Sequence, residues 1–172
     1  MVTLVTSAEP FSETARAAFV ELLKDKATSL YWGVNPLITD LSLASELHLL
    51  HGKPTLTEKI NGCTYTIHPN SFFQTNSYMA ARLMDVVREF AGLTGKEDLL
   101  DLYCGAGFFG IALARDAKNV LGIESDHQAI HLAKENAIAN NVTNATFLTG
   151  TAEALLPNLP RQDVVIVDPP RS

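Results

Sequence analysis

The sequence has little of what several common classes of protein require. Cys63 and Cys104 are the only cysteines among 172 residues, too few for a disulfide framework, which favours a cytoplasmic protein. No apolar run approaches the roughly 18 residues that a membrane-spanning helix needs. Residues 1–10 lack the basic and apolar regions of a signal peptide. We therefore expect a cytoplasmic protein that has no membrane partner.

Positive charge is also scarce. The chain has 13 Lys and Arg residues against 19 Asp and Glu residues, a net charge of -6. A domain that holds nucleic acid by its phosphates usually presents a basic face. This balance argues against autonomous RNA binding by these residues, although a larger protein that contains them can bind RNA elsewhere. The apolar content of 47% is that of a globular chain.

The first part of the chain mixes helix and strand signals, and we expect an α+β subdomain over residues 1–74. Apolar residues recur at helical spacing over residues 11–22, and residues 30–34 are expected to form a strand. Asn61-Gly62 separates two β-prone runs and supplies the positive φ angles of a type I′ turn. This predicts a hairpin near residues 55–67.

A helix over residues 76–92 is expected to link this subdomain to the next one. Asn76 is suited to cap its start, and Gly92 to end it. Its predicted buried stripe consists of Met79, Leu83, Val86, Val87 and Phe90.

Residues 75–172 alternate strand and helix, which predicts an α/β, Rossmann-like parallel sheet covered by helices. The expected strands are residues 99–103, 119–124, 145–148 and 163–168. The sequence ends at Ser172, directly after the fourth strand, whereas a doubly wound sheet normally continues. We therefore expect a sheet truncated after its fourth strand, or a partner chain that covers this edge.

A glycine-rich turn follows the first of these strands. Gly105 and Gly107 let the backbone pass close to a ligand, where a Cβ atom would clash. Glu124 follows Gly105 by nineteen residues, at the end of the next strand, where its carboxylate is suited to bind both hydroxyls of a ribose. The alternative is a tight strand-to-helix turn that binds nothing.

The turn also fits the dinucleotide fingerprint G-x-G-x-x-G, so an NAD-binding domain is a competing interpretation. Two features favour S-adenosyl-L-methionine instead. Asp101 precedes the turn, and its negative charge suits an ammonium and a sulfonium better than a pyrophosphate. The fourth strand leads into Asp168-Pro169-Pro170-Arg171, a stiff loop at the edge where ligands of this architecture bind. The alternative for this loop is a strand-ending turn with an exposed Arg171.

Three segments together resemble the RNA (uracil-5-)-methyltransferase family, which methylates 23S rRNA and tRNA. They are His68-Pro-Asn-Ser-Phe-Phe-Gln-Thr-Asn76, Leu100-Asp-Leu-Tyr-Cys-Gly-Ala-Gly107 and Asp168-Pro-Pro-Arg171. The resemblance implies a Rossmann-like S-adenosylmethionine-dependent methyltransferase fold. With the residues above, it implies cofactor contacts from Gln74, Asp101, Tyr103, Gly105, Gly107, Glu124 and Asp168. Some members have a polar residue where this chain has Phe108, which puts one cofactor contact in doubt.

The family's reaction needs two further residues. A Cys thiolate adds to position 6 of uracil, position 5 attacks the methyl group, and a Glu removes the remaining proton. The resemblance places both residues after the Asp-Pro-Pro-Arg motif, downstream of Ser172, so no catalytic residue is expected within the chain. Members commonly have an upstream RNA-binding barrel, and some have an iron–sulfur cluster, for which this sequence offers no counterpart.

Other chemistry-bearing residues have plainer interpretations. Cys104 and Cys63 are expected to be structural thiols. His127 and His131 are four residues apart but have no third ligand nearby, and Glu46, His48 and His51 are an equally weak set, so no metal is expected.

The sequence thus predicts the cofactor-binding part of an enzyme that methylates position 5 of uracil in rRNA or tRNA, with RNA as the partner of the full-length protein. Two alternatives remain open: a non-catalytic fragment that binds cofactor or a partner, and an NAD-binding Rossmann domain.

Overall fold

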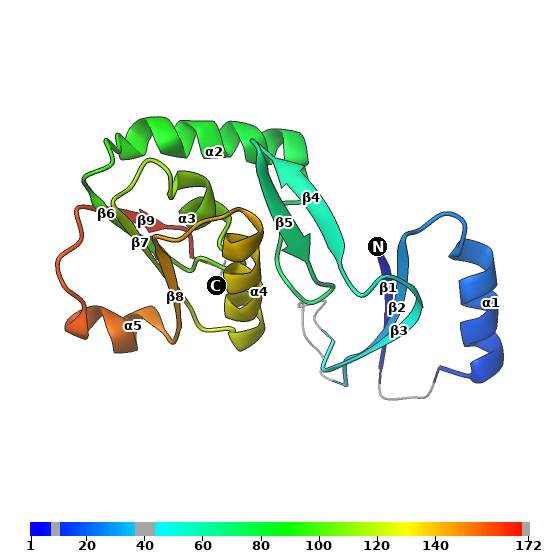
Figure 1. The fold of residues 1–172 in the computed structure, drawn as a ribbon. Coiled ribbons are helices and arrows are strands. Elements are labelled where there is room, and N and C mark those ends of the chain that lie inside the picture. The colour runs from blue at the N-terminus through cyan, green and yellow to red at the C-terminus, as the bar shows by residue number, and fades with distance from the viewer. Residues whose placement is uncertain (8–10, 37–43, 170–172) are drawn as a thin grey trace. The chain divides into compact units, whose positions relative to one another are not determined.

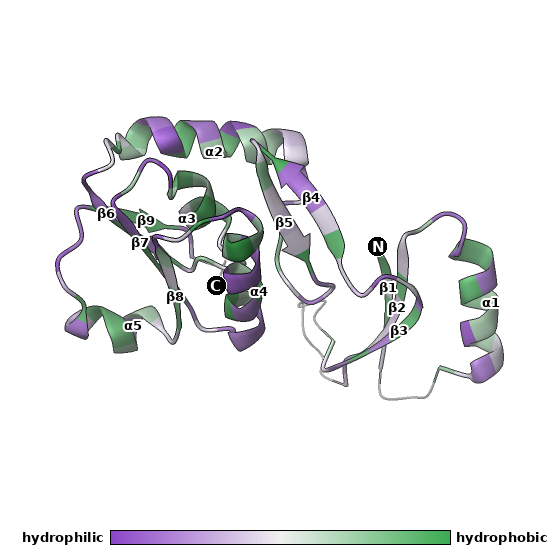
Figure 2. Cartoon of the chain, in the orientation of Figure 1, coloured by the Kyte–Doolittle hydropathy of each residue, from purple (hydrophilic) through white to green (hydrophobic). Residues whose placement is uncertain are grey.

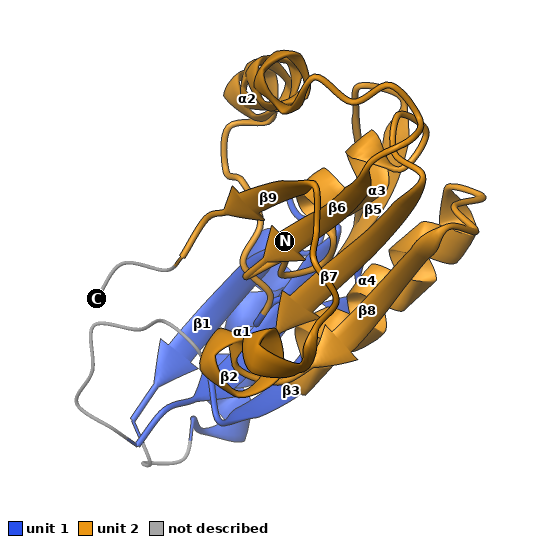
Figure 3. Ribbon diagram, turned by 90° about the vertical axis from the view of Figure 1, so that its left-hand side faces the viewer, with its two compact units in different colours: residues 1–56, 68–70 blue, residues 57–67, 71–172 orange. Residues whose placement is uncertain are grey.

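The computed structural model describes residues 1–7, 11–36 and 44–169, which form two compact units (Figures 1 and 3). Unit 1 comprises residues 1–56 and 68–70, and unit 2 comprises residues 57–67 and 71–172.

Unit 1 is a small sheet with one helix. Its elements are β1 (Val2–Thr6), α1 (Glu13–Leu23), β2 (Ser29–Val34) and β3 (Glu46–Gly52). β2 pairs in parallel with β1 and antiparallel with β3. The Ser12 side chain caps α1 by accepting a hydrogen bond from the Ala15 amide at 3.2 Å. The helix and the strand at residues 30–34 are confirmed, whereas β1 and β3 were not predicted.

The predicted hairpin is present, as β4 (Leu56–Ile60) and β5 (Cys63–Ile67). Asn61 and Gly62 have φ angles of 46° and 81°, the positive values that a type I′ turn requires. The hairpin belongs to unit 2, whereas the sequence analysis grouped it with residues 1–74. The reason is that the β5 backbone hydrogen-bonds to side chains of a helix some 70 residues later, a pairing that no local pattern reveals.

Helix α2 (Ser77–Ala91) follows the hairpin, and both of its predicted caps are confirmed. Asn76 accepts a hydrogen bond from the Met79 amide at 3.1 Å, and Gly92 ends the helix with a φ of 56°. The predicted buried stripe is wrong except at Val87, which packs against the core. Met79 and Phe90 are 56% and 86% exposed, whereas Ala80 and Met84 are buried. Figure 2 shows apolar and polar residues mixed along this helix, and several of its apolar side chains are exposed, so periodicity alone did not identify the buried face.

The main sheet of unit 2 has four strands, all parallel, in the order β8-β7-β6-β9. Its elements are β6 (Asp98–Leu102), α3 (Phe108–Leu113), β7 (Asn119–Glu124), α4 (His127–Ala139), β8 (Ala145–Thr149), α5 (Ala152–Leu155), a 3₁₀ turn (Leu156–Asn158) and β9 (Val164–Val167). Both the predicted parallel α/β sheet and the alternation of its elements are confirmed.

The sheet is covered on both faces. One cluster of buried side chains joins the hairpin, α2, α3 and α4 to the sheet, and includes Tyr65, Met84, Ile111 and Phe147. A second cluster on the other face joins Leu100 and Ile123 to Ala152 of α5. At one edge, β9 pairs with β6 and leaves Val167 59% exposed. Pro170 and Arg171 lie outside the described residues.

Candidate functional site

The candidate site is the carboxyl edge of the four-stranded sheet. Leu102 is in register with Ile123 of β7 and with Val167 of β9. The next residue along each strand is a predicted site residue, namely Tyr103, Glu124 and Asp168. Because the strands are parallel, these three residues end at the same edge. The chain proceeds from β6 to β7 and β8 and then crosses back to β9, so the direction of strand order reverses between β6 and β9. Ligands of parallel α/β sheets bind at this kind of switch point.

The glycine turn connects β6 to α3 and has an unusual backbone. Tyr103, Gly105 and Gly107 all have positive φ angles, of 62°, 52° and 84°. A Cβ atom on Gly107 would lie 2.7 Å from the side chain of Ile111, so this glycine is required by packing. A Cβ atom on Gly105 would meet nothing within 4 Å. Gly105 therefore faces the open side of the turn, where a ligand has room.

Glu124 connects the end of β7 to this turn. Its Oε2 atom accepts a hydrogen bond from the Gly105 amide at 3.3 Å. Its Oε1 atom accepts from the Ser125 amide at 2.6 Å, from the Ser125 hydroxyl at 3.0 Å and from the Asp126 amide at 3.0 Å. Each carboxylate oxygen has two lone pairs, so Oε2 retains one that can accept a hydrogen bond from a ligand hydroxyl.

Asp101 is buried beneath the turn, with only 1% of its surface exposed. Its Oδ2 atom accepts a hydrogen bond from the Gly110 amide in the first turn of α3 at 2.8 Å, so it caps that helix. Its Oδ1 atom is buried and has no partner. Burial, helped by the nearby charges of Asp168 and Glu124 and opposed by the Gly110 hydrogen bond, raises the pKa of this carboxyl to about 7. Asp101 and Gly110 are nine residues apart, so local capping patterns do not predict this role.

Gln74 lies half-buried in the loop that precedes α2. The residue before it, Phe73, packs edge-to-face against Phe108 of the glycine turn, with ring centroids 5.9 Å apart. Phe108 is the position where a polar cofactor contact was in doubt, and here it is part of an aromatic cluster. Tyr65 of β5 completes the cluster and donates a hydrogen bond to the Phe108 carbonyl at 2.9 Å. The loop that carries Gln74 is thereby attached to the turn.

One residue that holds the turn was missed by the sequence analysis. Asn136 of α4 is fully buried. Its side chain accepts a hydrogen bond from the Thr66 amide of β5 at 2.7 Å and donates one to the Ala106 carbonyl in the turn at 3.1 Å. A buried Asn on a helix interior is unfavourable without such partners, and its place on the apolar face of α4 was the available signal.

Neither cysteine is exposed. Cys104 is 5% exposed, and burial raises the pKa of its thiol far above its usual range, which disfavours the thiolate. Cys63 is half-buried in the hairpin. His131 is exposed on α4 and lies 3.4 Å from Glu135. Within the described part of the chain, no group of three His, Cys, Asp or Glu side chains is arranged to hold a metal ion.

Two cavities of about 220 and 400 Å³ are lined by residues at the opposite, amino edge of the sheet. The candidate site therefore rests on its residues: a turn with positive φ angles, the spare lone pair on Glu124 and the unpartnered oxygen of Asp101.

Comparison with known proteins identifies the family. The sequence model of tRNA (uracil-5-)-methyltransferase matches residues 53–163. The chain belongs to the tRNA (uracil-5-)-methyltransferase family. It is 45% identical over 86% of its length to a tRNA (uracil(54)-C(5))-methyltransferase of Pyrococcus horikoshii. It is also 40% identical over 90% of its length to an uncharacterised RNA methyltransferase of Nanoarchaeum equitans. The chain spans 34% of the length of each of these two relatives.

Solved structures agree with this family assignment. The chain is 36% identical to a Pyrococcus abyssi tRNA (uracil-54, C5)-methyltransferase, solved in complex with S-adenosyl-L-homocysteine, with a TM-score of 0.75. The likeness covers 98% of this chain and 39% of that one. A tRNA m1G37 methyltransferase of M. jannaschii, at 19% identity and a TM-score of 0.63, shows the fold alone. The α/β fold is that of S-adenosylmethionine-dependent methyltransferases, as predicted. No helix among the described residues is both long enough and apolar enough to cross a membrane.

Proposed function

We propose that this chain is the cofactor-binding part of an S-adenosylmethionine-dependent RNA methyltransferase that methylates position 5 of uracil. The observation that carries the proposal is the hydrogen bond between Glu124 and the Gly105 turn at the switch point of the parallel sheet, within the segment that matches the family. Two of the relatives described above are tRNA (uracil-54, C5)-methyltransferases, which favours tRNA over rRNA as the substrate of the whole protein.

The residues at the carboxyl edge fit S-adenosylmethionine. Glu124 would bind the ribose through the unused lone pair of Oε2, in the space that Gly105 leaves open. The buried Oδ1 atom of Asp101 has no donor, and the ammonium of the cofactor would supply one. Gln74, Tyr103 and Asp168 would form the remaining contacts. When bound, the cofactor supplies an electrophilic methyl group.

The same residues disfavour NAD. Asp101, Glu124 and Asp168 place three carboxyl groups around one turn, and the charges of the other two raise the pKa of Asp101. A pyrophosphate here would meet repulsion from these groups, whereas a ligand that carries an ammonium and a sulfonium would neutralise them.

Replacing Glu124 with alanine is expected to weaken binding of S-adenosyl-L-homocysteine by about 1.5–3 kcal/mol, the range for hydrogen bonds to a charged group. Calorimetry on the folded variant measures this loss. Glu153→Ala is the matched control, because Glu153 is an exposed carboxylate in the first turn of α5. Equal affinity in wild type and a folded Glu124→Ala variant would mean that the ribose lies elsewhere.

The 172-residue chain alone is expected to transfer no methyl group to RNA. The reaction needs a thiolate against position 6 of uracil, and the burial of Cys104 keeps its thiol protonated. The net charge of -6 adds repulsion from RNA. The assay is transfer of labelled methyl groups to unmodified tRNA transcripts. Label above background from the wild-type chain that disappears in Cys104→Ala would contradict this expectation and make Cys104 the nucleophile.

A chimera tests the whole-protein function. In it, this chain replaces the matching segment of the P. abyssi enzyme, to which it is 36% identical. We expect the chimera to form 5-methyluridine in a tRNA transcript, as read by mass spectrometry, and its Glu124→Ala version to be impaired. A folded chimera that binds cofactor but modifies only an rRNA fragment, or a base other than uracil, would overturn the proposed substrate.

A further inference from the structure

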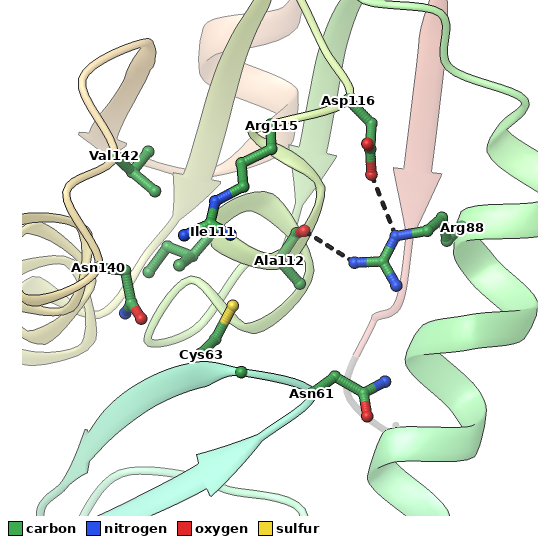
Figure 4. A pocket seen from close by; sticks show the side chains of 10 residues that line it. Asn61, Cys63, Arg88, Ile111, Ala112, Arg115, Asp116, Asn140 and Val142 are labelled. Atoms are coloured by element: carbon green, nitrogen blue, oxygen red, sulfur yellow. Dashed lines mark hydrogen bonds and ion pairs between the residues drawn. The ribbon is translucent and has the colours of Figure 1, made fainter.

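A second candidate site lies at the amino edge of the sheet in unit 2. A cavity of about 220 Å³ opens there between the hairpin, the end of α2, the end of α3 and the end of α4 (Figure 4). Its charged lining residues are Arg88, Arg115 and Asp116. The cavity lies at the opposite end of the six-residue helix α3 from the glycine turn, roughly 9 Å away at the usual rise of a helix.

Only one of the three charges is uncompensated. Arg88 donates to Asp116 at 3.0 Å and to the Ala112 carbonyl at 3.0 Å, and it lies 3.5 Å from Asp85. The guanidinium of Arg115 has no hydrogen bond or ion pair with any residue that the structure describes. Figure 4 shows the Arg115 side chain extending from the turn after α3 toward Ile111, which also lines the cavity. Arg115 is exposed at the rim of the cavity, and its planar fork of N–H donors has no acceptor among the described residues.

The polar walls of the cavity are already satisfied by the protein. The amide of Asn61 donates to the Ala81 carbonyl and to Asp85. Asn140 bonds to both the N–H and the carbonyl of Thr64. These contacts hold the walls in place and leave Arg115 as the group available to bind a ligand.

The geometry points to a binding site for a phosphate ester, held by the guanidinium of Arg115. A guanidinium binds phosphate oxygens bidentately and stays charged at all physiological pH values. The volume is several times the roughly 30 Å³ that one water occupies in the liquid, so the cavity takes more than a bare anion. Ile111, Ala112 and Val142 line it with apolar surface, which suits the organic part of an ester. The phosphate can belong to a free sugar phosphate or to an RNA chain.

The test uses the 172-residue chain with ¹⁵N labelling and amide and Arg Nε–H NMR spectra. The ligands are ribose 5-phosphate, the dinucleotide uridylyl-uridine and inorganic phosphate, each titrated at constant ionic strength. Arg115→Gln removes the charge, and Arg161→Gln is the control, because Arg161 is exposed ahead of β9. We expect saturable shifts confined to the cavity residues with at least one ester. That affinity should fall at least tenfold in Arg115→Gln and be unchanged in Arg161→Gln.

The two esters distinguish the source of the phosphate, since preference for the dinucleotide indicates RNA and preference for ribose 5-phosphate indicates a metabolite. Chemical shifts that change linearly without saturation would overturn the site, as would equal ester affinity in wild type and Arg115→Gln. Inorganic phosphate that binds as tightly as either ester would also overturn it, because the site would then hold an adventitious ion only. S-adenosyl-L-homocysteine is added separately. Failure of that ligand to bind counts against the proposed function and leaves the outcome at Arg115 unaffected.

Discussion

Replacing Asp101 with asparagine is expected to make the ligand-free chain more stable near pH 8. In the folded protein, burial raises the pKa of Asp101 to about 7, against an ordinary value of 3.8. A carboxyl group whose pKa is higher in the folded than in the unfolded protein stabilises the fold fully at pH values below the unfolded-state pKa. This stabilisation is lost as the pH rises through the folded-state pKa. The free energy of unfolding of the wild type should therefore fall by roughly 2 kcal/mol between pH 5.5 and 8, whereas that of Asp101→Asn should not show this fall.

Urea unfolding of both proteins at the two pH values measures this difference. Titration of Glu97 does not contribute to this difference, because hydrogen bonds from Thr94 lower its pKa to about 2, below the range of pH 5.5 to 8. The asparagine retains an oxygen that can accept the Gly110 hydrogen bond, so the cap on α3 survives. If the free energy of unfolding changed equally with pH in the two proteins, the pKa of Asp101 would not be raised by folding.

The same substitution is expected to weaken cofactor binding. If the ammonium of S-adenosylmethionine pairs with the Oδ1 atom of Asp101, the neutral amide loses a charge-assisted hydrogen bond, about 1.5–3 kcal/mol. The Asp101→Asn variant should thus be more stable than the wild type in the absence of ligand, and should bind the cofactor more weakly. A variant that gains stability and keeps full affinity would leave Asp101 as a helix cap only.

Asn136→Ala is expected to have the largest effect on folding. The substitution leaves the Thr66 amide and the Ala106 carbonyl without their hydrogen-bond partner, at a position where Asn136 is fully buried. Each unsatisfied buried group costs about 1–3 kcal/mol, so the variant should be destabilised by roughly 2–5 kcal/mol. Asn140→Ala is the matched control, because Asn140 makes similar hydrogen bonds to Thr64 from a half-buried position where water can replace its side chain. This variant should lose clearly less free energy of unfolding than Asn136→Ala.

Thermal unfolding and hydrogen exchange of the Thr66 amide measure these effects. Asn136→Ala should also accelerate exchange in β5 before global unfolding, because the bridge between the hairpin and the turn is lost. Equal stability of the Asn136→Ala and Asn140→Ala variants would contradict the account of the buried bridge.

Local signals predicted the elements that depend on few residues. The Asn61-Gly62 pair has the positive φ angles that its turn type requires, and Asn76 and Gly92 cap α2 as expected. The alternation of strands and helices correctly predicted a parallel sheet, whose geometry brings Tyr103, Glu124 and Asp168 to one edge.

Features that depend on distant partners were not predictable in this way. The buried face of α2 was misassigned, because apolar residues cover several of its sides and only tertiary packing selects Ala80 and Met84. The cap that Asp101 provides for α3 and the bridge of Asn136 both need contacts between separate segments. Periodicity and capping rules report local structure, so such contacts lie beyond them.

The central claim is that the carboxyl edge of this sheet binds the S-adenosylmethionine pair and not a dinucleotide. Isothermal calorimetry of the 172-residue chain with S-adenosyl-L-homocysteine, and separately with NAD, tests it most directly. The carboxyl groups of Asp101 and Glu124 predict saturable binding of S-adenosyl-L-homocysteine with one site per chain and no heat of binding with NAD. Binding of NAD, together with no binding of either S-adenosyl-L-homocysteine or S-adenosyl-L-methionine, would contradict the account.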